Sequence, residues 1–121
     1  MATTRTLKAG DVLFTEGDPS NAMYVVKSGQ LSVFKGKNYH EVELAKIGPD
    51  EVVGEMAFFD HQPRSASVRA KKDSEVLELP FNALQAQFDA LPNWIQALVK
   101  SINEHLRMAN IRIKELENRR G

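Results

Sequence analysis

One stretch near the middle of the chain decides the fold: Val53-Gly54-Glu55-Met56-Ala57-Phe58-Phe59-Asp60-His61-Gln62-Pro63-Arg64-Ser65-Ala66-Ser67-Val68. Gly54 permits a backbone turn, or a close approach, that a side chain would block. Residues 55–59 can then form one short helical turn, whose free N–H groups would point toward an anion. Residues 60–63 return the chain to a strand that opens with Arg64. The stretch therefore predicts a small pocket inside a barrel, lined by N–H donors.

The charged side chains of this stretch fit a ribose cyclic phosphate. Arg64 can make bidentate, charge-assisted hydrogen bonds to phosphate oxygens. Glu55 can accept a hydrogen bond from the ribose 2′-hydroxyl, which stays free in a 3′,5′-cyclic nucleotide. We expect the two charges to compensate each other partly when no ligand is bound, and we expect no chemistry on the ligand. The predicted ligand-binding residues here are Gly54, Glu55, Met56, Ala57, Arg64, Ser65 and Ala66.

Short apolar runs separated by turn signals flank this stretch on both sides. Strands are expected at residues 11–14, 23–26, 30–35, 42–47, 65–70 and 75–79. Within the third of these, the alternation places Leu31 and Val33 inward and Ser32 outward. Many short strands with turns between them predict an antiparallel β-barrel or jelly roll rather than a parallel sheet.

The last third of the chain changes to a helical pattern. Residues 80–91 predict a short helix, and a long helix follows from Trp94 almost to the end. The long helix carries apolar residues in alternating steps of four and three, at Ile95, Val99, Ile102, Leu106, Ala109, Ile113 and Leu116. This spacing is that of a coiled-coil seam. The seam favours a parallel homodimer over a helix packed only on its own barrel. Together, the predicted strands and the helices that follow them give an α+β fold class.

Length and composition narrow the function classes. The chain has 121 residues, so we expect a single domain over 1–121, with a barrel at 1–79 and helices at 80–121. Its 16 basic and 16 acidic side chains give no net charge, whereas DNA binding favours a basic surplus. The chain contains no apolar run long enough for a signal peptide or a membrane span. We therefore expect a cytoplasmic protein that binds neither DNA nor membrane.

Metal chemistry is not expected. The chain has no cysteine, and its histidines, His40, His61 and His105, lie far apart on different expected elements. Neither a His-x-His nor a Glu-x-x-His spacing occurs, so no metal or cofactor is predicted. The alternative of a cupin-type metal enzyme, which shares the barrel architecture, lacks the histidine cluster that its metal would need.

At this point the sequence resembles a known family. Gly54-Glu55-Met56-Ala57 followed by Arg64-Ser65-Ala66-Ser67-Val68 resembles the phosphate-binding cassette of cyclic-nucleotide-binding domains, here residues 53–68. The segment 13–29 resembles the N-terminal signature of that family, although Phe14 and Ser20 replace its usual residue types. The helices after residue 79 resemble the B and C helices of the family, so the likeness covers nearly the whole chain.

The resemblance implies a stand-alone sensor that binds cyclic AMP, with cyclic GMP left open, and that signals through its C-terminal helices to an unknown protein effector. It is closest to the catabolite-activator branch, where helix C supplies polar groups to the base. The matching positions here are Ala109 and Asn110, so Asn110 is added to the predicted ligand-binding residues. The DNA-binding module of that branch is expected to be missing. A structural dimerisation domain that has lost ligand binding is the alternative.

Overall fold

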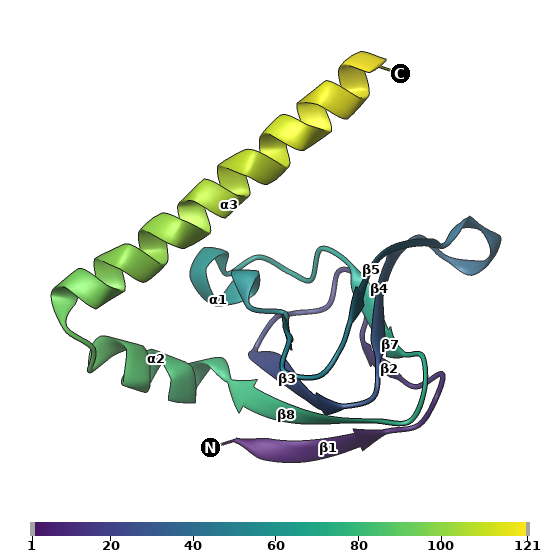
Figure 1. Cartoon of the computed structure of the whole chain (residues 1–121), viewed down its shortest axis with the longest axis horizontal. Coiled ribbons are helices and arrows are strands. Elements are labelled where there is room, and N and C mark those ends of the chain that lie inside the picture. Colours follow the sequence, from purple (N-terminus) through teal and green to yellow (C-terminus); the bar gives the residue numbers. More distant parts are fainter. Residues whose placement is uncertain (1, 121) are drawn as a thin grey trace. The chain divides into compact units, whose positions relative to one another are not determined.

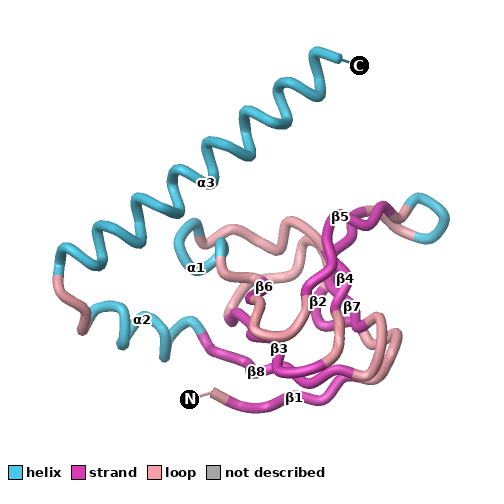
Figure 2. The backbone as a smooth tube through the Cα atoms, viewed as in Figure 1, coloured by secondary structure: helices cyan, strands magenta, loops and turns pink. Residues whose placement is uncertain are grey.

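The computed structural model describes residues 2–120, except for the side chains of residues 38, 110, 111 and 113–120. Its contacts divide the chain into two compact units, Met1–Leu84 and Gln85–Gly121. The first unit holds the strands, and the second holds the long helix (Figures 1 and 2).

The elements of the structure include the six expected strands and two strands that were not expected, Thr3–Leu7 and Val52–Val53. In chain order, the elements are β1 Thr3–Leu7, β2 Val12–Phe14, β3 Ala22–Ser28, β4 Leu31–Lys35, the 3-10 helix η1 Asn38–His40, β5 Val42–Ile47, β6 Val52–Val53, α1 Met56–Asp60, β7 Ser67–Ala70, β8 Ser74–Pro80, α2 Phe81–Asp89 and α3 Asn93–Arg120. Most strands are short and are separated by tight turns, which is the pattern of an antiparallel barrel or sandwich.

The strands form two four-stranded sheets. One sheet has the order β1-β8-β3-β6 and the other the order β2-β7-β4-β5, and every pair is antiparallel. Neighbours in a sheet often lie far apart in the sequence, as β1 and β8 do (Figure 1). Two antiparallel sheets followed by C-terminal helices confirm the α+β jelly-roll prediction.

A single cluster of buried apolar side chains joins the two sheets. Its fully buried members are Val26 and Val76 from one sheet and Leu31 and Val68 from the other. Burial of such side chains is worth about 1.5–3 kcal/mol each. The core therefore holds the two sheets together.

The predicted alternation in β4 is wrong at Ser32. This residue was expected to face outward, but it is only 2% exposed, and its hydroxyl donates a hydrogen bond of 2.6 Å to Glu43 Oε2 on β5. The acceptor satisfies the hydroxyl, which removes most of the cost of burying it. Conversely, Val42 and Leu44 on β5 are more than half exposed.

The strand expected at 65–70 begins two residues later, at Ser67, so Arg64 lies in the loop before it. Ser67 is buried, and its Oγ accepts a hydrogen bond of 2.8 Å from the Glu16 N–H. The loop that carries Arg64 is thereby held beside the turn that follows β2.

The second unit is helical, as the sequence predicts. In α3, the seam residues Ile95 and Val99 are half-buried, whereas Ile102 and Leu106 are more than half exposed. The seam continues through Ala109, which is exposed, to Ile113 and Leu116, whose side chains lie outside the described residues. Within residues 2–120, no helix combines the length and apolar character that crossing a membrane requires.

Candidate functional site

The site is built around the segment between β6 and β7. Gly54 follows β6 with a φ of +85°, a left-handed conformation that glycine adopts without strain. Glu55 precedes the single helical turn α1, and the turn ends at His61, whose N–H donates to the Ala57 carbonyl at 2.9 Å. A short loop then leads from α1 to β7 (Figure 2). Arg64 belongs to this loop. The local structure is the turn, helical turn and loop that the sequence predicts.

The backbone of Arg64 is fixed by the turn between β2 and β3. Its carbonyl accepts a hydrogen bond of 2.8 Å from the Gly17 N–H, and its own N–H donates to the Asp18 carbonyl at 2.9 Å. Ser20 Oγ reinforces this junction by donating to the Gln62 carbonyl at 2.9 Å. Arg64 therefore starts from a rigid backbone, although it lies in a loop.

The side chain of Arg64 points into the first unit and is 6% exposed as a residue. Its Nη2 donates a hydrogen bond of 2.6 Å to the Ala22 carbonyl at the start of β3, and its Nη1 donates to the Gly54 carbonyl at 3.3 Å. The buried Nε has no hydrogen-bond partner in the described part of the chain. Unsatisfied buried donors are rare, so this one marks a place where an acceptor is missing.

Two aromatic rings, and no ion-paired carboxylate among the described residues, lie next to the Arg64 guanidinium. Its Cζ lies 4.0 Å from the centroid of the Phe14 ring and 5.9 Å from that of Tyr24. None of the ion pairs between described residues involves Arg64. Burial lowers the pKa of Arg64, while Tyr24 and Asp18 act in the opposite direction. The site thus holds a desolvated cation that has no carboxylate partner among the described side chains.

The other predicted residues occupy different environments. Glu55 is exposed and makes no side-chain hydrogen bond or ion pair with described residues, so the expected charge compensation between Glu55 and Arg64 is wrong for this structure. Carbonyl oxygens and aromatic rings, instead of the Glu55 carboxylate, stabilise the Arg64 guanidinium. Ser65 is exposed and Ala66 is buried on the stretch that leads to β7. Both residues are close to Arg64 in the chain and leave its donors free.

Three further residues belong to the predicted site. Met56 and Ala57 lie on α1 and are half-buried. Asn110 belongs to α3 in the second unit, and its side chain lies outside the described residues. The structure therefore brings the predicted residues between 54 and 66 together in one unit, whereas the side chain predicted to contact the base, that of Asn110, is not described.

Sequence reasoning missed the aromatic residues at the site. In the sequence, Phe14 stands out only as an unusual residue in the N-terminal signature, and Tyr24 lies in an expected strand without a role. Tyr24 is buried, and its hydroxyl donates a hydrogen bond of 3.1 Å to Glu78 Oε1, which also accepts one from Arg5 Nη1 at 3.2 Å. The one signal in the sequence for an aromatic residue at the site is Phe14, which replaces the usual residue type of the N-terminal signature just before the turn that holds Arg64.

Tyr24 gives a pH-dependence that can be measured. Burial, and then the hydrogen bond to Glu78, raise the pKa of Tyr24. The resulting stabilisation is complete below the pKa of the unfolded phenol, about 10, and it is lost as the pH rises through the higher folded value. In a Tyr39→Phe variant, Tyr24 is the one remaining tyrosine. We expect its phenolate absorbance to appear at higher pH in the folded protein than in denaturant. Coincident titration curves would contradict the assignment.

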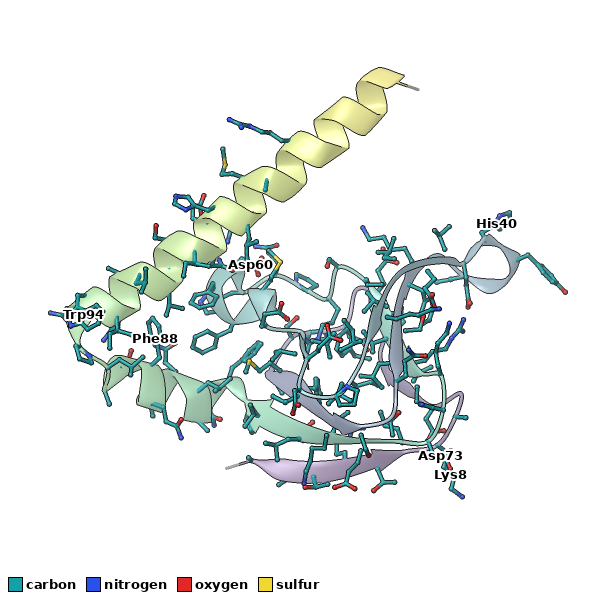
Figure 3. All side chains as sticks on the ribbon, viewed as in Figure 1. Lys8, His40, Asp60, Asp73, Phe88 and Trp94 are labelled. Atoms are coloured by element: carbon teal, nitrogen blue, oxygen red, sulfur yellow. The ribbon has the colours of Figure 1, made fainter. Side chains whose placement is uncertain are left out.

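Among the described residues, no group of three or more His, Cys, Asp or Glu side chains could hold a metal ion. His40, for example, lies at the outer tip of the hairpin formed by β4 and β5 (Figure 3). The donors that the site does offer are the N–H groups around Arg64. Such donors suit an anionic oxygen, as in a phosphate.

The chain is similar in sequence to known proteins of one family. The family model of the cyclic nucleotide-binding domain matches residues 4–90. The cyclic AMP receptor protein of Thermus thermophilus is 34% identical over 105 residues, which are 86% of this chain and 49% of that protein. The cAMP-dependent protein kinase regulatory subunit of Hypocrea atroviridis is 37% identical over 82 residues, 68% of this chain and 17% of that protein.

A solved structure shows the same fold. The EAL enzyme Bd1971 in its cAMP-bound form has a TM-score of 0.74 and 30% identity, over 97% of this chain and 32% of that one. Its cGMP-bound form has a TM-score of 0.76 and 27% identity, over the same shares of the two chains. The present chain spans about half or less of the length of the curated relatives it matches.

Proposed function

Because the chain belongs to the family of cyclic nucleotide-binding domains, we propose that it is a sensor that binds a cyclic mononucleotide through Arg64 and performs no chemistry on it. Cyclic AMP is the favoured ligand, since both curated relatives compared above are named for it. Cyclic GMP is the alternative, because Bd1971 has been solved with each nucleotide.

The observation that carries this proposal is the state of the Arg64 guanidinium. A buried charge is costly unless it is paired and hydrogen-bonded. Arg64 is buried, its Nε–H has no acceptor among the described residues, and no carboxylate there pairs with it. A cyclic phosphate would supply both the missing acceptor and the missing negative charge, through the bidentate geometry that arginine favours.

The neighbouring residues have roles consistent with the same ligand. The exposed Ser65 hydroxyl and the backbone amides of Ser65 and Ala66 can add donors to the phosphate. Glu55 is exposed and has no described partner, so its carboxylate is available for the ribose 2′-hydroxyl. Met56 and Ala57 offer backbone N–H groups from α1, and Asn110 is the proposed contact to the base.

Isothermal titration calorimetry with cyclic AMP, cyclic GMP and 5′-AMP tests the proposal directly. We expect saturable binding of at least one cyclic nucleotide and weaker binding of 5′-AMP, because the second phosphate charge of 5′-AMP has no second cation to pair with at Arg64. If a folded sample bound neither cyclic nucleotide, the sensor proposal would be wrong, and a purely structural domain would be favoured.

Gly54 provides a sharp test of the site geometry. A Cβ at this position would lie 2.7 Å from Arg64 Nη1, so Gly54→Ala should displace the guanidinium. We expect cyclic AMP affinity to fall about tenfold or more, the worth of a hydrogen bond to a charged group. Gly10→Ala is the matched control, because Gly10 has a similar φ of +93° and no atom within 4 Å of the added Cβ.

Both glycine variants should lose about 1 kcal/mol of stability, because alanine is strained at positive φ. Thermal unfolding measures that shared loss, and calorimetry measures the difference in binding. Equal affinities of the two variants for cyclic AMP would show that the close approach of Gly54 to Arg64 has no part in binding.

For the output of the sensor, we propose that ligand binding shifts the arrangement of the C-terminal helices, and that α3 forms a parallel homodimer seam. Ile102 and Leu106 support the second point, since both are apolar, lie at seam spacing and are more than half exposed in the single chain. Sedimentation of the calorimetry samples, with and without nucleotide, gives the mass in solution. A monomer under both conditions would contradict the seam.

A further inference from the structure

Phe14 lies at the end of β2, where the pairing with β7 is irregular. Val12 pairs with Arg69 and Phe14 pairs with Val68, so β2 carries one extra residue, Leu13, between the two pairs. An irregularity of this kind is a β-bulge, which bends a strand and redirects its side chains. Consequently Leu13 is buried in the core, and the adjacent Phe14 also packs against the core.

The redirected ring of Phe14 stacks against the guanidinium of Arg64. The Cζ atom of Arg64 lies 4.0 Å from the centroid of this ring. The Tyr24 ring lies beside both groups, with its centroid 6.0 Å from that of Phe14, at an interplanar angle of 33°, and 5.9 Å from Arg64 Cζ. Arg64 therefore meets an aromatic surface, and hydrogen bonds to the carbonyls of Ala22 and Gly54 fix two of its nitrogens.

An aromatic partner has an advantage here that a carboxylate partner lacks. The N–H donors of a guanidinium lie in its plane, whereas an aromatic ring attracts the cation through its face. A ring can thus offset part of the cost of burying the charge without occupying any donor. A carboxylate would occupy the donors that a phosphate needs.

We propose that Phe14 is a positioning residue, which holds the buried guanidinium of Arg64 in place and leaves its Nε edge free for the phosphate of the nucleotide. This inference rests on the proposed function for the identity of the ligand. The stacking of Phe14 on Arg64 does not depend on the proposed function, because it exists in the ligand-free chain. An aliphatic residue at position 14 would fill space but would attract the cation far less.

The first measurement needs no nucleotide. In the NMR spectrum of the ligand-free protein, a held guanidinium gives a slowly exchanging Nε–H signal for Arg64, shifted by the ring current of Phe14. We expect Phe14→Leu to lose the ring-current shift and to speed the exchange with water, and we expect Phe14→Tyr to keep both features. An unchanged Arg64 signal in a folded Phe14→Leu protein would overturn the proposal.

The second measurement is the affinity for cyclic AMP by calorimetry. Phe14→Leu should weaken binding about tenfold, the scale of a desolvated cation–π contact, and Phe14→Tyr should restore it. Phe34→Leu is the matched control, because Phe34 is a buried phenylalanine that lies 4.2 Å from a different arginine, Arg69. Phe34→Leu should bind cyclic AMP like the unaltered protein. Equal affinity of a folded Phe14→Leu protein would refute the positioning role.

The two measurements separate the possible failures. If the unaltered protein bound neither cyclic AMP nor cyclic GMP, the proposed function would fall, and the NMR comparison would still decide whether Phe14 holds Arg64. Thermal unfolding of each variant checks the fold. If Phe14→Leu were unfolded, Phe14→Met would replace it, since methionine preserves more of the side-chain volume and also lacks the ring.

Discussion

Replacement of Arg64 by methionine is expected to weaken cyclic AMP binding by about 30-fold or more, because loss of one partner in a desolvated charge pair costs about 2–5 kcal/mol. The same change should leave the free energy of unfolding unchanged or slightly higher. Methionine keeps an apolar contact with Phe14 and removes a buried cation that has no carboxylate partner among the described residues. Calorimetry and denaturant unfolding of one preparation measure both effects.

Arg69→Met is the matched control for Arg64→Met. Arg69 lies on β7, stacks on Phe34 and pairs with Glu41 Oε2 at 2.6 Å. Its replacement should not alter the affinity for cyclic AMP, because Arg69 faces a different ring and has its own carboxylate. Cyclic AMP binding of normal strength by Arg64→Met would show that Arg64 does not bind the phosphate. A large loss of stability would show instead that the guanidinium serves the fold.

The largest effect on stability is expected from Leu31→Ala. Leu31 is 0% exposed and lies in the cluster that joins the two sheets. Truncation of a buried leucine costs about 2–5 kcal/mol, because the lost apolar contacts add to the cavity left behind. Denaturant unfolding followed by circular dichroism should show this loss as a lower transition midpoint with an unchanged slope.

Leu44→Ala makes the identical chemical change at an exposed position. Leu44 lies on β5 and is 53% exposed, so its truncation should alter stability by about 0.5 kcal/mol or less. The comparison removes any general effect of leucine-to-alanine substitution. Similar losses in the two variants would mean that the cluster around Leu31 is not the core that stabilises the first unit.

The parts of the fold and site that could be predicted from the sequence are those that depend on local pattern. Gly54 and Arg64 could be chosen because they are particular residue types at a fixed spacing, a glycine before a short helical turn and an arginine after it. The strands could be found where glycine and proline turns bound apolar runs, as around β3 and β4. These signals are contained within a few neighbouring residues.

The rest depends on partners far away in the chain. β1 could not be predicted, because Thr3–Leu7 contains a single buried apolar residue, Leu7, and the strand forms through its pairing with β8. The outward prediction for Ser32 was wrong because alternation alone cannot show that Glu43 offers an acceptor on β5. The ring of Phe14 reaches Arg64 through a bulge, and a bulge becomes visible only when the register of two strands is known.

The pairing of β1 with β8 also has a consequence for biosynthesis. Thr3 pairs with Glu78, and β8 lies between β1 and β3 in its sheet. While β8 is still inside the ribosome, the nascent chain therefore exposes the hydrogen-bonding edges of β1 and β3 that β8 will cover. Exposed strand edges promote aggregation. Contacts between such distant residues also form slowly. The sheet that contains β1, β8 and β3 can thus be completed only after Pro80 has left the exit tunnel.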